Sequence, residues 1–268
     1  MSILHEILKY KREELQSTKS DIPLSDLKAR IKDMDAVRCF KTAIKRQEDK
    51  PVNLIAELKK ASPSKGLIRK DFSLLQIISI YDKKDVAAIS VLTEKRFFDG
   101  SLSYLNQARK RTTKPLLRKD FIFDHYQVYE SRANNADAVL LIVSALDKSL
   151  LNDLFHLARE LTLECLVEVH NWKELDIALY MGAEIIGINN RDLNTLNISL
   201  DISLSLLKDV PDDRIVVSES GINTRADVEA LQATKTDAIL VGTALMKAED
   251  IGARIDELLG KQQVMDRN

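Results

Sequence analysis

The sequence has little of what metal sites, disulfide frameworks and cofactor motifs require. Among 268 residues there are two cysteines, Cys39 and Cys165, and neither stands in a ligand spacing such as CxxC. The four histidines are scattered and form no HExxH pattern. We therefore expect no metal site and no cofactor, and two free thiols in a reducing compartment.

Long apolar runs and an excess of one charge are also missing. No segment approaches the roughly 20 apolar residues of a membrane span. The amino-terminal segment MSILHEILKYKREELQ is charged throughout and lacks the apolar region of a signal peptide. The net charge of −1 gives no general attraction to nucleic acid or acidic membranes. These features predict a cytoplasmic protein with neither nucleic acid nor membrane as a partner.

What the sequence does contain, after Pro51, is an alternation of short apolar runs and longer stretches with helical spacing. The runs are rich in β-branched residues and cover 53–58, 87–93, 115–121, 138–144, 164–169, 185–191, 214–220 and 238–243. Eight such units in about 200 residues predict an α/β fold, a (β/α)8 TIM barrel. The alternative is an open doubly wound sheet, which usually carries a GxGxxG motif that is absent here.

The segment before the first predicted strand has a helical pattern of its own. Apolar residues recur at helical spacing from Ile3 to Leu15, and a second amphipathic stretch follows Pro23. We expect a single barrel domain over residues 1–268, with residues 1–50 as a helical extension packed on the barrel.

Polar side chains collect where the predicted strands end. Catalytic groups of a barrel lie at the carboxyl ends of its strands, and six of the eight ends carry such groups. These residues are Glu57, Lys59, Lys119, Glu168, Asn189, Arg191, Glu219, Ser220 and Thr243. A single one is more often a solvated rim residue, but so many together favour a site. Side chains two apart share a face, so Glu57 and Lys59 point the same way, inward if Leu54, Ala56 and Leu58 meet the helices.

Glycine and aromatic residues are scarce, so their positions carry information. Gly221 and Gly242 follow the seventh and eighth predicted strands, where barrels commonly bind phosphate. Their backbone N–H groups can approach an anion closely, although both glycines could simply shape tight turns. Phe98 and Phe121 follow the second and third strands and could form an apolar wall for an aromatic ligand, or equally pack within the loops.

The ordered motifs IAELKKASPSKG, LRKDFI, LVEVH, IGINNRDL, SESGI and LVGTALM together resemble the indole-3-glycerol phosphate synthase family. The resemblance runs from the helical extension to the eighth strand. It implies a lyase of tryptophan biosynthesis that closes the ring of 1-(2-carboxyphenylamino)-1-deoxyribulose 5-phosphate, with loss of carbon dioxide and water. The implied partner is thus a phosphorylated small molecule, and we expect a monomer or weak homodimer.

The resemblance also implies roles for single residues. Lys119 corresponds to the family's leading general acid and Glu168 to its base. The other catalytic candidates are Glu57, Lys59, Asn189 and Ser220; the substrate-binding candidates are Ser62, Phe98, Phe121, Arg191 and Glu219; the phosphate-binding candidates are Gly221, Gly242 and Thr243. Relatives often carry serine where this sequence has Thr243.

Two other functions fit parts of the pattern. Another phosphate-binding barrel enzyme, such as a sugar-phosphate isomerase, would share the last two loops but would lack the two lysine motifs ELKKASPSKG and RKDF. A barrel without catalytic activity could serve as a scaffold. Such a protein would not need a suitable residue at every catalytic position, and this sequence has one at each.

Overall fold

The computed structural model describes residues 3–192 and 195–261, and its centre is a closed barrel of parallel strands. The barrel strands are β1 (Asn53–Leu58), β4 (Ala88–Leu92), β5 (Leu116–Lys119), β6 (Ala138–Ile142), β7 (Glu164–Val169), β8 (Ile185–Asn189), β9 (Ile215–Glu219) and β10 (Ala238–Val241). Each lies within a range predicted from the sequence. The ring closes because β1 pairs with both β4 and β10, so the predicted TIM barrel is confirmed and the open sheet is excluded.

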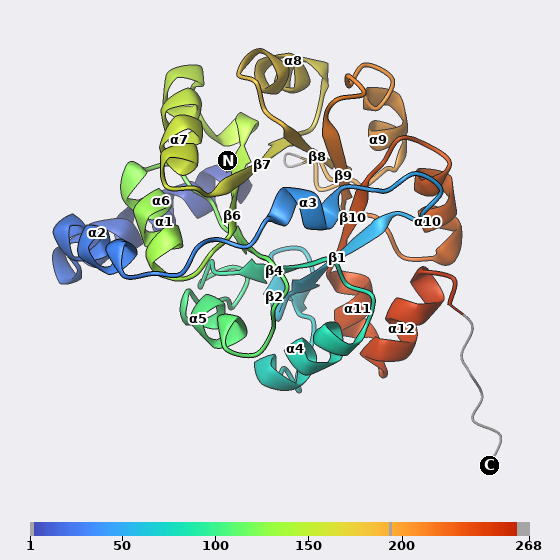
Figure 1. The fold of residues 1–268 in the computed structure, drawn as a ribbon, viewed down its shortest axis with the longest axis horizontal. Coiled ribbons are helices and arrows are strands. Elements are labelled where there is room, and N and C mark those ends of the chain that lie inside the picture. Colours follow the sequence, from blue (N-terminus) through green and yellow to red (C-terminus); the bar gives the residue numbers. More distant parts are fainter. Residues whose placement is uncertain (1–2, 193–194, 262–268) are drawn as a thin grey trace.

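Helices surround the barrel, as Figure 1 shows. They are α4 (Leu74–Lys83), α5 (Ser103–Arg109), α6 (His125–Ala133), η1 (Val143–Ala145), α7 (Lys148–Glu160), α8 (Trp172–Tyr180), α9 (Asp201–Leu206), α10 (Arg225–Gln232), α11 (Thr243–Lys247) and α12 (Ile251–Leu258). Several begin at a side-chain cap, which satisfies a free backbone N–H group and marks the helix start. The capping residues are Asp124, Asp147, Asn171, Thr224 and Asp250.

The alternation of side chains along each strand divides the core into two layers. Leu54, Ala56 and Leu58 of β1 point outward and join the cluster that includes the inner faces of the helices. Ile55 points inward and packs with Leu117 and other residues inside the barrel. Both faces of every strand are therefore covered, which explains the nearly continuous apolar runs.

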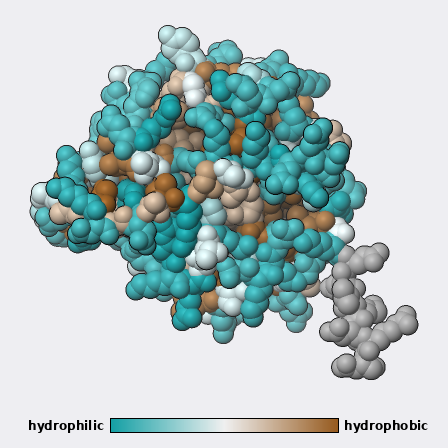
Figure 2. Space-filling view, viewed as in Figure 1, coloured by the Kyte–Doolittle hydropathy of each residue, from teal (hydrophilic) through white to brown (hydrophobic). Residues whose placement is uncertain are grey.

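The amino-terminal residues form α1 (Ile3–Asp21), α2 (Leu24–Lys32) and α3 (Phe40–Ile44). Phe40 and Ile44 are fully buried and pack with the interior residues Ile55 and Leu117, so α3 closes the end of the barrel where the strands begin. Figure 1 shows α3 crossing the barrel at the front, with α1 farther away. Hydrophilic residues cover most of the surface around α3 in the same view (Figure 2).

The segment after β1 contains more structure than the predicted loop. Residues of the SPSKG segment form a small antiparallel hairpin of β2 (Ala61–Ser62) and β3 (Gly66–Leu67). The hairpin is tied to the next loop, because the backbone N–H of Ala61 donates to the carbonyl of Phe98 at 3.2 Å. In the part of the chain that the structure describes, no helix is both long and apolar enough to cross a membrane.

Candidate active site

A cavity of about 180 Å³ opens where the barrel strands end. It is lined by every candidate residue identified from the sequence: Glu57, Lys59, Ser62, Phe98, Lys119, Phe121, Glu168, Asn189, Arg191, Glu219, Ser220, Gly221, Gly242 and Thr243. These residues come from positions 57 to 243, and the parallel strands bring them together because all strands end at the same side of the barrel.

Lys119 lies at the centre of the polar groups in this cavity. Its ammonium donates to Glu168 Oε2 and to Glu219 Oε2, each at 2.7 Å. Burial by itself would lower the pKa of Lys119, but Glu168, Glu219 and Glu57 outweigh burial and raise that pKa above its usual value. Lys119 therefore carries its proton throughout the pH range in which proteins are active.

Glu168 and Glu219 share Lys119 but differ in protonation. Burial would raise the pKa of Glu168, but Lys119 and His170 outweigh burial and hold it below its usual range. Among the described residues Glu219 has no comparable second partner, since its buried Oε1 makes no hydrogen bond with any of them. Burial raises the pKa of Glu219 to about 7, and the charge of Glu168 adds to this against the opposing effect of Lys119. At lower pH the pair thus takes up its proton on Glu219 first.

A second charged pair and an aromatic wall lie beside this centre. Lys59 Nζ is 3.2 Å from Glu57 Oε1 and 5.6 Å from the centre of the Phe98 ring. The rings of Phe98 and Phe121 are 6.1 Å apart, with an angle of 38° between their planes. The two rings therefore lie near each other at the cavity, with the Lys59 ammonium over Phe98.

The loop after β9 has a left-handed backbone, whereas the glycine after β10 leaves room for a neighbouring side chain. Ser220 and Gly221 both adopt left-handed conformations, with φ of +66° and +82°. A Cβ atom on Gly242 would lie 2.5 Å from Glu57 Oε1, so the absence of a side chain there makes room for a catalytic candidate. Burial and the nearby cations Lys247 and Arg191 lower the pKa of Lys65, which also lines the cavity. The region is positively charged and suited to an anion.

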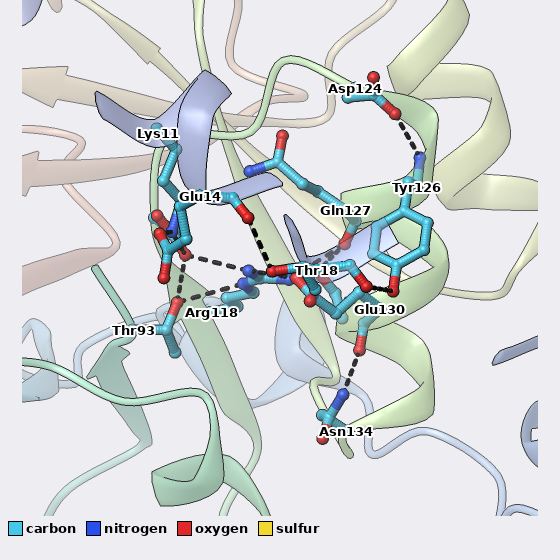
Figure 3. Close-up of polar contacts among 12 residues, drawn as sticks. Lys11, Glu14, Thr18, Thr93, Arg118, Asp124, Tyr126, Gln127, Glu130 and Asn134 are labelled. Atoms are coloured by element: carbon cyan, nitrogen blue, oxygen red, sulfur yellow. Dashed lines mark hydrogen bonds and ion pairs between the residues drawn. The ribbon is translucent and has the colours of Figure 1, made fainter. Parts of the chain in front are cut away.

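A buried polar network connects β5 to the helices α1 and α6. Asp120 accepts from Lys11 at 3.0 Å and from Arg118 at 3.0 Å, and Arg118 also donates to Glu130 at 2.7 Å. Figure 3 shows Lys11, Arg118, Thr93 and Glu130 gathered around this network. Burial would raise the pKa of Asp120, but Lys11 and Arg118 lower it to about 2. Helix α1 is thus connected to the strand that presents Lys119.

Three features of the site were not identified from the sequence. Ile3, Leu4 and Ile7 of α1 line the cavity, although their helical spacing predicted only packing on the barrel. His170 lies 3.3 Å from Glu168 Oε1, and its position two residues after Glu168 was the available signal. Gly187 lies in the middle of β8 beside Glu219, and a glycine inside a strand often marks such a close approach.

Within the described part of the chain, the site shows no arrangement suited to a metal ion. Among the residues described, no three histidine, cysteine, aspartate or glutamate side chains are grouped as metal ligands. The charges at the centre are instead a lysine between two glutamates, an arrangement for moving protons.

Solved structures share this fold. A 3-hexulose-6-phosphate synthase from Salmonella typhimurium superimposes with a TM-score of 0.63 at 16% identity, over 78% of this chain and 97% of that one. A tryptophan synthase α-subunit from Pyrococcus furiosus gives a TM-score of 0.60 at 15% identity, over 78% of this chain and 98% of that one. At such identities the similarity concerns the barrel alone.

Sequence comparison is more specific. The family model described as indole-3-glycerol phosphate synthase matches residues 4–258. An indole-3-glycerol phosphate synthase of Alkaliphilus metalliredigens is 48% identical over 96% of this chain and 97% of its own length. One of Thermoanaerobacter pseudethanolicus is 44% identical over 92% of this chain and 94% of its own length. This chain therefore belongs to the indole-3-glycerol phosphate synthase family.

Proposed function

We propose that this cavity binds 1-(2-carboxyphenylamino)-1-deoxyribulose 5-phosphate and closes its ring to indole-3-glycerol phosphate, the reaction of this family of carboxy-lyases in tryptophan biosynthesis. The observation that carries the assignment is the Lys119 ammonium held between Glu168 and Glu219, in one cavity with an aromatic wall and a cationic glycine-rich end. The substrate has a matching set of groups: a benzoate ring, a ketone and a phosphate.

Lys119 acts as the general acid of the ring closure. The ring carbon bearing the carboxylate attacks the ketone carbon, negative charge develops on the ketone oxygen, and Lys119 donates a proton to that oxygen. The carboxylate then leaves as carbon dioxide, and the bonding electrons restore the aromatic ring. Glu219 lies 2.7 Å from Lys119 and has a pKa of about 7, so it can return a proton to the lysine.

Glu168 acts as the base of the dehydration. After decarboxylation the new hydroxyl leaves as water and the neighbouring ring CH2 group loses a proton, so that the ring nitrogen keeps its hydrogen in the indole product. This step requires an acid and a base on different sides. Glu168 is ionised, and Asn189 orients it by donating from Nδ2 to Oε1 at 3.1 Å. Lys59, paired with Glu57, first binds the benzoate carboxylate and then protonates the leaving hydroxyl. Acid or base groups in position contribute about 10²–10⁴-fold each.

The remaining candidates bind the rest of the substrate. The Phe98 and Phe121 rings contact the benzoate ring, and Ser62 of the hairpin after β1 closes this end of the cavity. Ser220 and Arg191 contact the hydroxylated chain. The phosphate binds to the backbone N–H groups at Gly221, Gly242 and Thr243.

The protein acts as a single barrel domain, as a monomer or weak homodimer in the cytoplasm. The extension of residues 1–50 belongs to that domain, because Leu15 and Leu27 pack against Tyr126 of α6. Sedimentation of the purified protein over a range of concentrations would measure the oligomeric state.

Indole fluorescence tests the activity directly. The purified protein is mixed with the carboxyphenylamino-deoxyribulose phosphate, and the product's fluorescence is followed, with Glu168→Gln as the control. A signal from wild type that falls at least about 10²-fold in the variant supports both the reaction and the site. Substrate binding without a signal from wild type would favour a scaffold, and neither binding nor signal would refute the substrate.

A further inference from the structure

His170 lies partly buried between two carboxylates, one in the active site and one outside it. Its Nε2 lies 3.3 Å from Glu168 Oε1, and its Nδ1 lies 2.9 Å from Glu174 Oε2. The exposed fractions of the three side chains are 9% for His170, 2% for Glu168 and 15% for Glu174. His170 itself does not line the cavity, so it reaches the substrate only through Glu168.

The atom of the His170 ring that faces Glu168 is Nε2. His170 Nε2 is buried and makes no hydrogen bond with the residues that the structure describes, so its contact with Glu168 is an ion pair. The charged groups facing the ring are Glu168 from β7 and Glu174 from α8, with Lys119 of β5 beyond Glu168. Burial would lower the pKa of His170, but the two carboxylates outweigh burial and raise that pKa to about 10. The ring is therefore an imidazolium at neutral pH.

The first turn of helix α8 is stabilised without the positive charge of His170. Asn171 caps α8 by accepting from the Glu174 backbone N–H at 3.1 Å, and Glu174 Oε2 also accepts from the His170 backbone N–H at 2.9 Å. The amino end of α8 thus has its own hydrogen bonds. A neutral ring bonded to Glu174 through Nδ1 would serve the helix equally well, so the charge facing Glu168 requires a different explanation.

We propose that His170 is a positioning residue for Glu168: its imidazolium holds Oε1, so that Oε2 faces Lys119 and the carboxylate stays ionised to act as the base. Glu174 in turn keeps the imidazolium charged. The inference rests on the proposed function, in which Glu168 is the base of the dehydration. Three side chains in line thereby connect α8 to the proton transfer.

The test compares His170→Gln and Glu174→Gln with the control His156→Gln, an exposed histidine of α7. His170→Gln removes the charge at every pH and should lower kcat about 10- to 100-fold, with KM within about twofold, because no substrate-binding group changes. Glu174→Gln keeps the imidazole but lowers its pKa. Its kcat should match wild type near about pH 6 and fall as the pH rises toward about 9, a decline that His170→Gln lacks. His156→Gln should behave as wild type.

Each other outcome has a definite meaning. If Glu168→Gln is inactive while His170→Gln retains kcat within about twofold of wild type, the positioning role is overturned and the proposed function stands. If Glu168→Gln keeps wild-type activity, the proposed function itself fails. If both new variants lose activity equally at all pH values and unfold at lower temperature than His156→Gln, His170 serves only the fold and the proposal is wrong.

Discussion

Replacing Gly187 by alanine should weaken the active site from inside the barrel. A Cβ atom at this position of β8 would lie 2.5 Å from Glu219 Oε1 and 3.2 Å from Leu166 Cδ1. The carboxylate would have to retreat by about 0.9 Å to reach an ordinary contact. That retreat would disturb the contact of Glu219 Oε2 with Lys119, which is 2.7 Å long and belongs to a side chain that is only 2% exposed.

Gly187→Ala should lower both the stability of the protein and its catalytic rate. Overpacking of a buried site costs about 1–3 kcal/mol, and replacing a strand glycine returns about 0.5–1 kcal/mol. The net loss spans about 0–2.5 kcal/mol, and its midpoint of about 1.2 kcal/mol should lower the melting temperature by about 2–5 °C in a chain of this size. Displacing Glu219 also moves Lys119, and an error of about 1 Å in a catalytic group costs up to about 10²-fold in rate.

A double variant provides the control for Gly187→Ala. Glu219→Asp shortens the facing side chain by one methylene group and should restore stability to the Gly187→Ala variant, so the two changes should be non-additive. Calorimetry measures the melting temperature, and the indole fluorescence assay measures kcat. A Gly187→Ala variant with the melting temperature and kcat of wild type would refute the reasoning, as would strict additivity in the double variant.

Three further predictions concern the same cavity. Lys119→Met should abolish turnover while phosphate-dependent binding, measured by calorimetric titration, changes little; near-wild-type turnover would exclude Lys119 as the acid. Gly242→Val should raise KM at least about tenfold, because its side chain would displace Glu57 and cover the phosphate position; an unchanged KM in the fluorescence assay would contradict this. Since the pKa of Glu219 is raised from 4.5 to about 7, the native state holds a proton that the unfolded chain releases. The free energy of unfolding, measured with urea, should thus fall from about pH 4.5 to about pH 7 relative to Glu219→Gln, and parallel curves for the two proteins would disprove the shift.

The order of strands and the faces of their side chains were predictable from local pattern. Each barrel strand is buried on both faces, so it appears in the sequence as a short apolar run. The first residue of each run lies within one position of the first residue of the corresponding strand. The alternation of side chains along the first strand then predicted that Glu57 and Lys59 point the same way, inward. In the structure both line the cavity. The hairpin at 61–67 was missed because two-residue strands leave no periodic signal.

The contacts that tune the site were not predictable, because they join residues far apart in the sequence. Lys11 and Asp120 are separated by 109 positions, and nothing near either residue indicates the other. The opposite pKa shifts of Glu168 and Glu219 likewise depend on which buried carboxylate receives a second cation. Local sequence shows that both are strand-end glutamates and no more.

The sequence by itself thus determined the barrel and the set of side chains at its mouth. The reason is that every strand is an apolar run whose side chains alternate between two faces. Only the tertiary structure decided which glutamate is held ionised and which has its pKa raised to about 7. The physical reason is that a protonation state depends on distances of about 3 Å between charges in a medium of low dielectric. Such distances arise when strands from separate parts of the chain close into a ring.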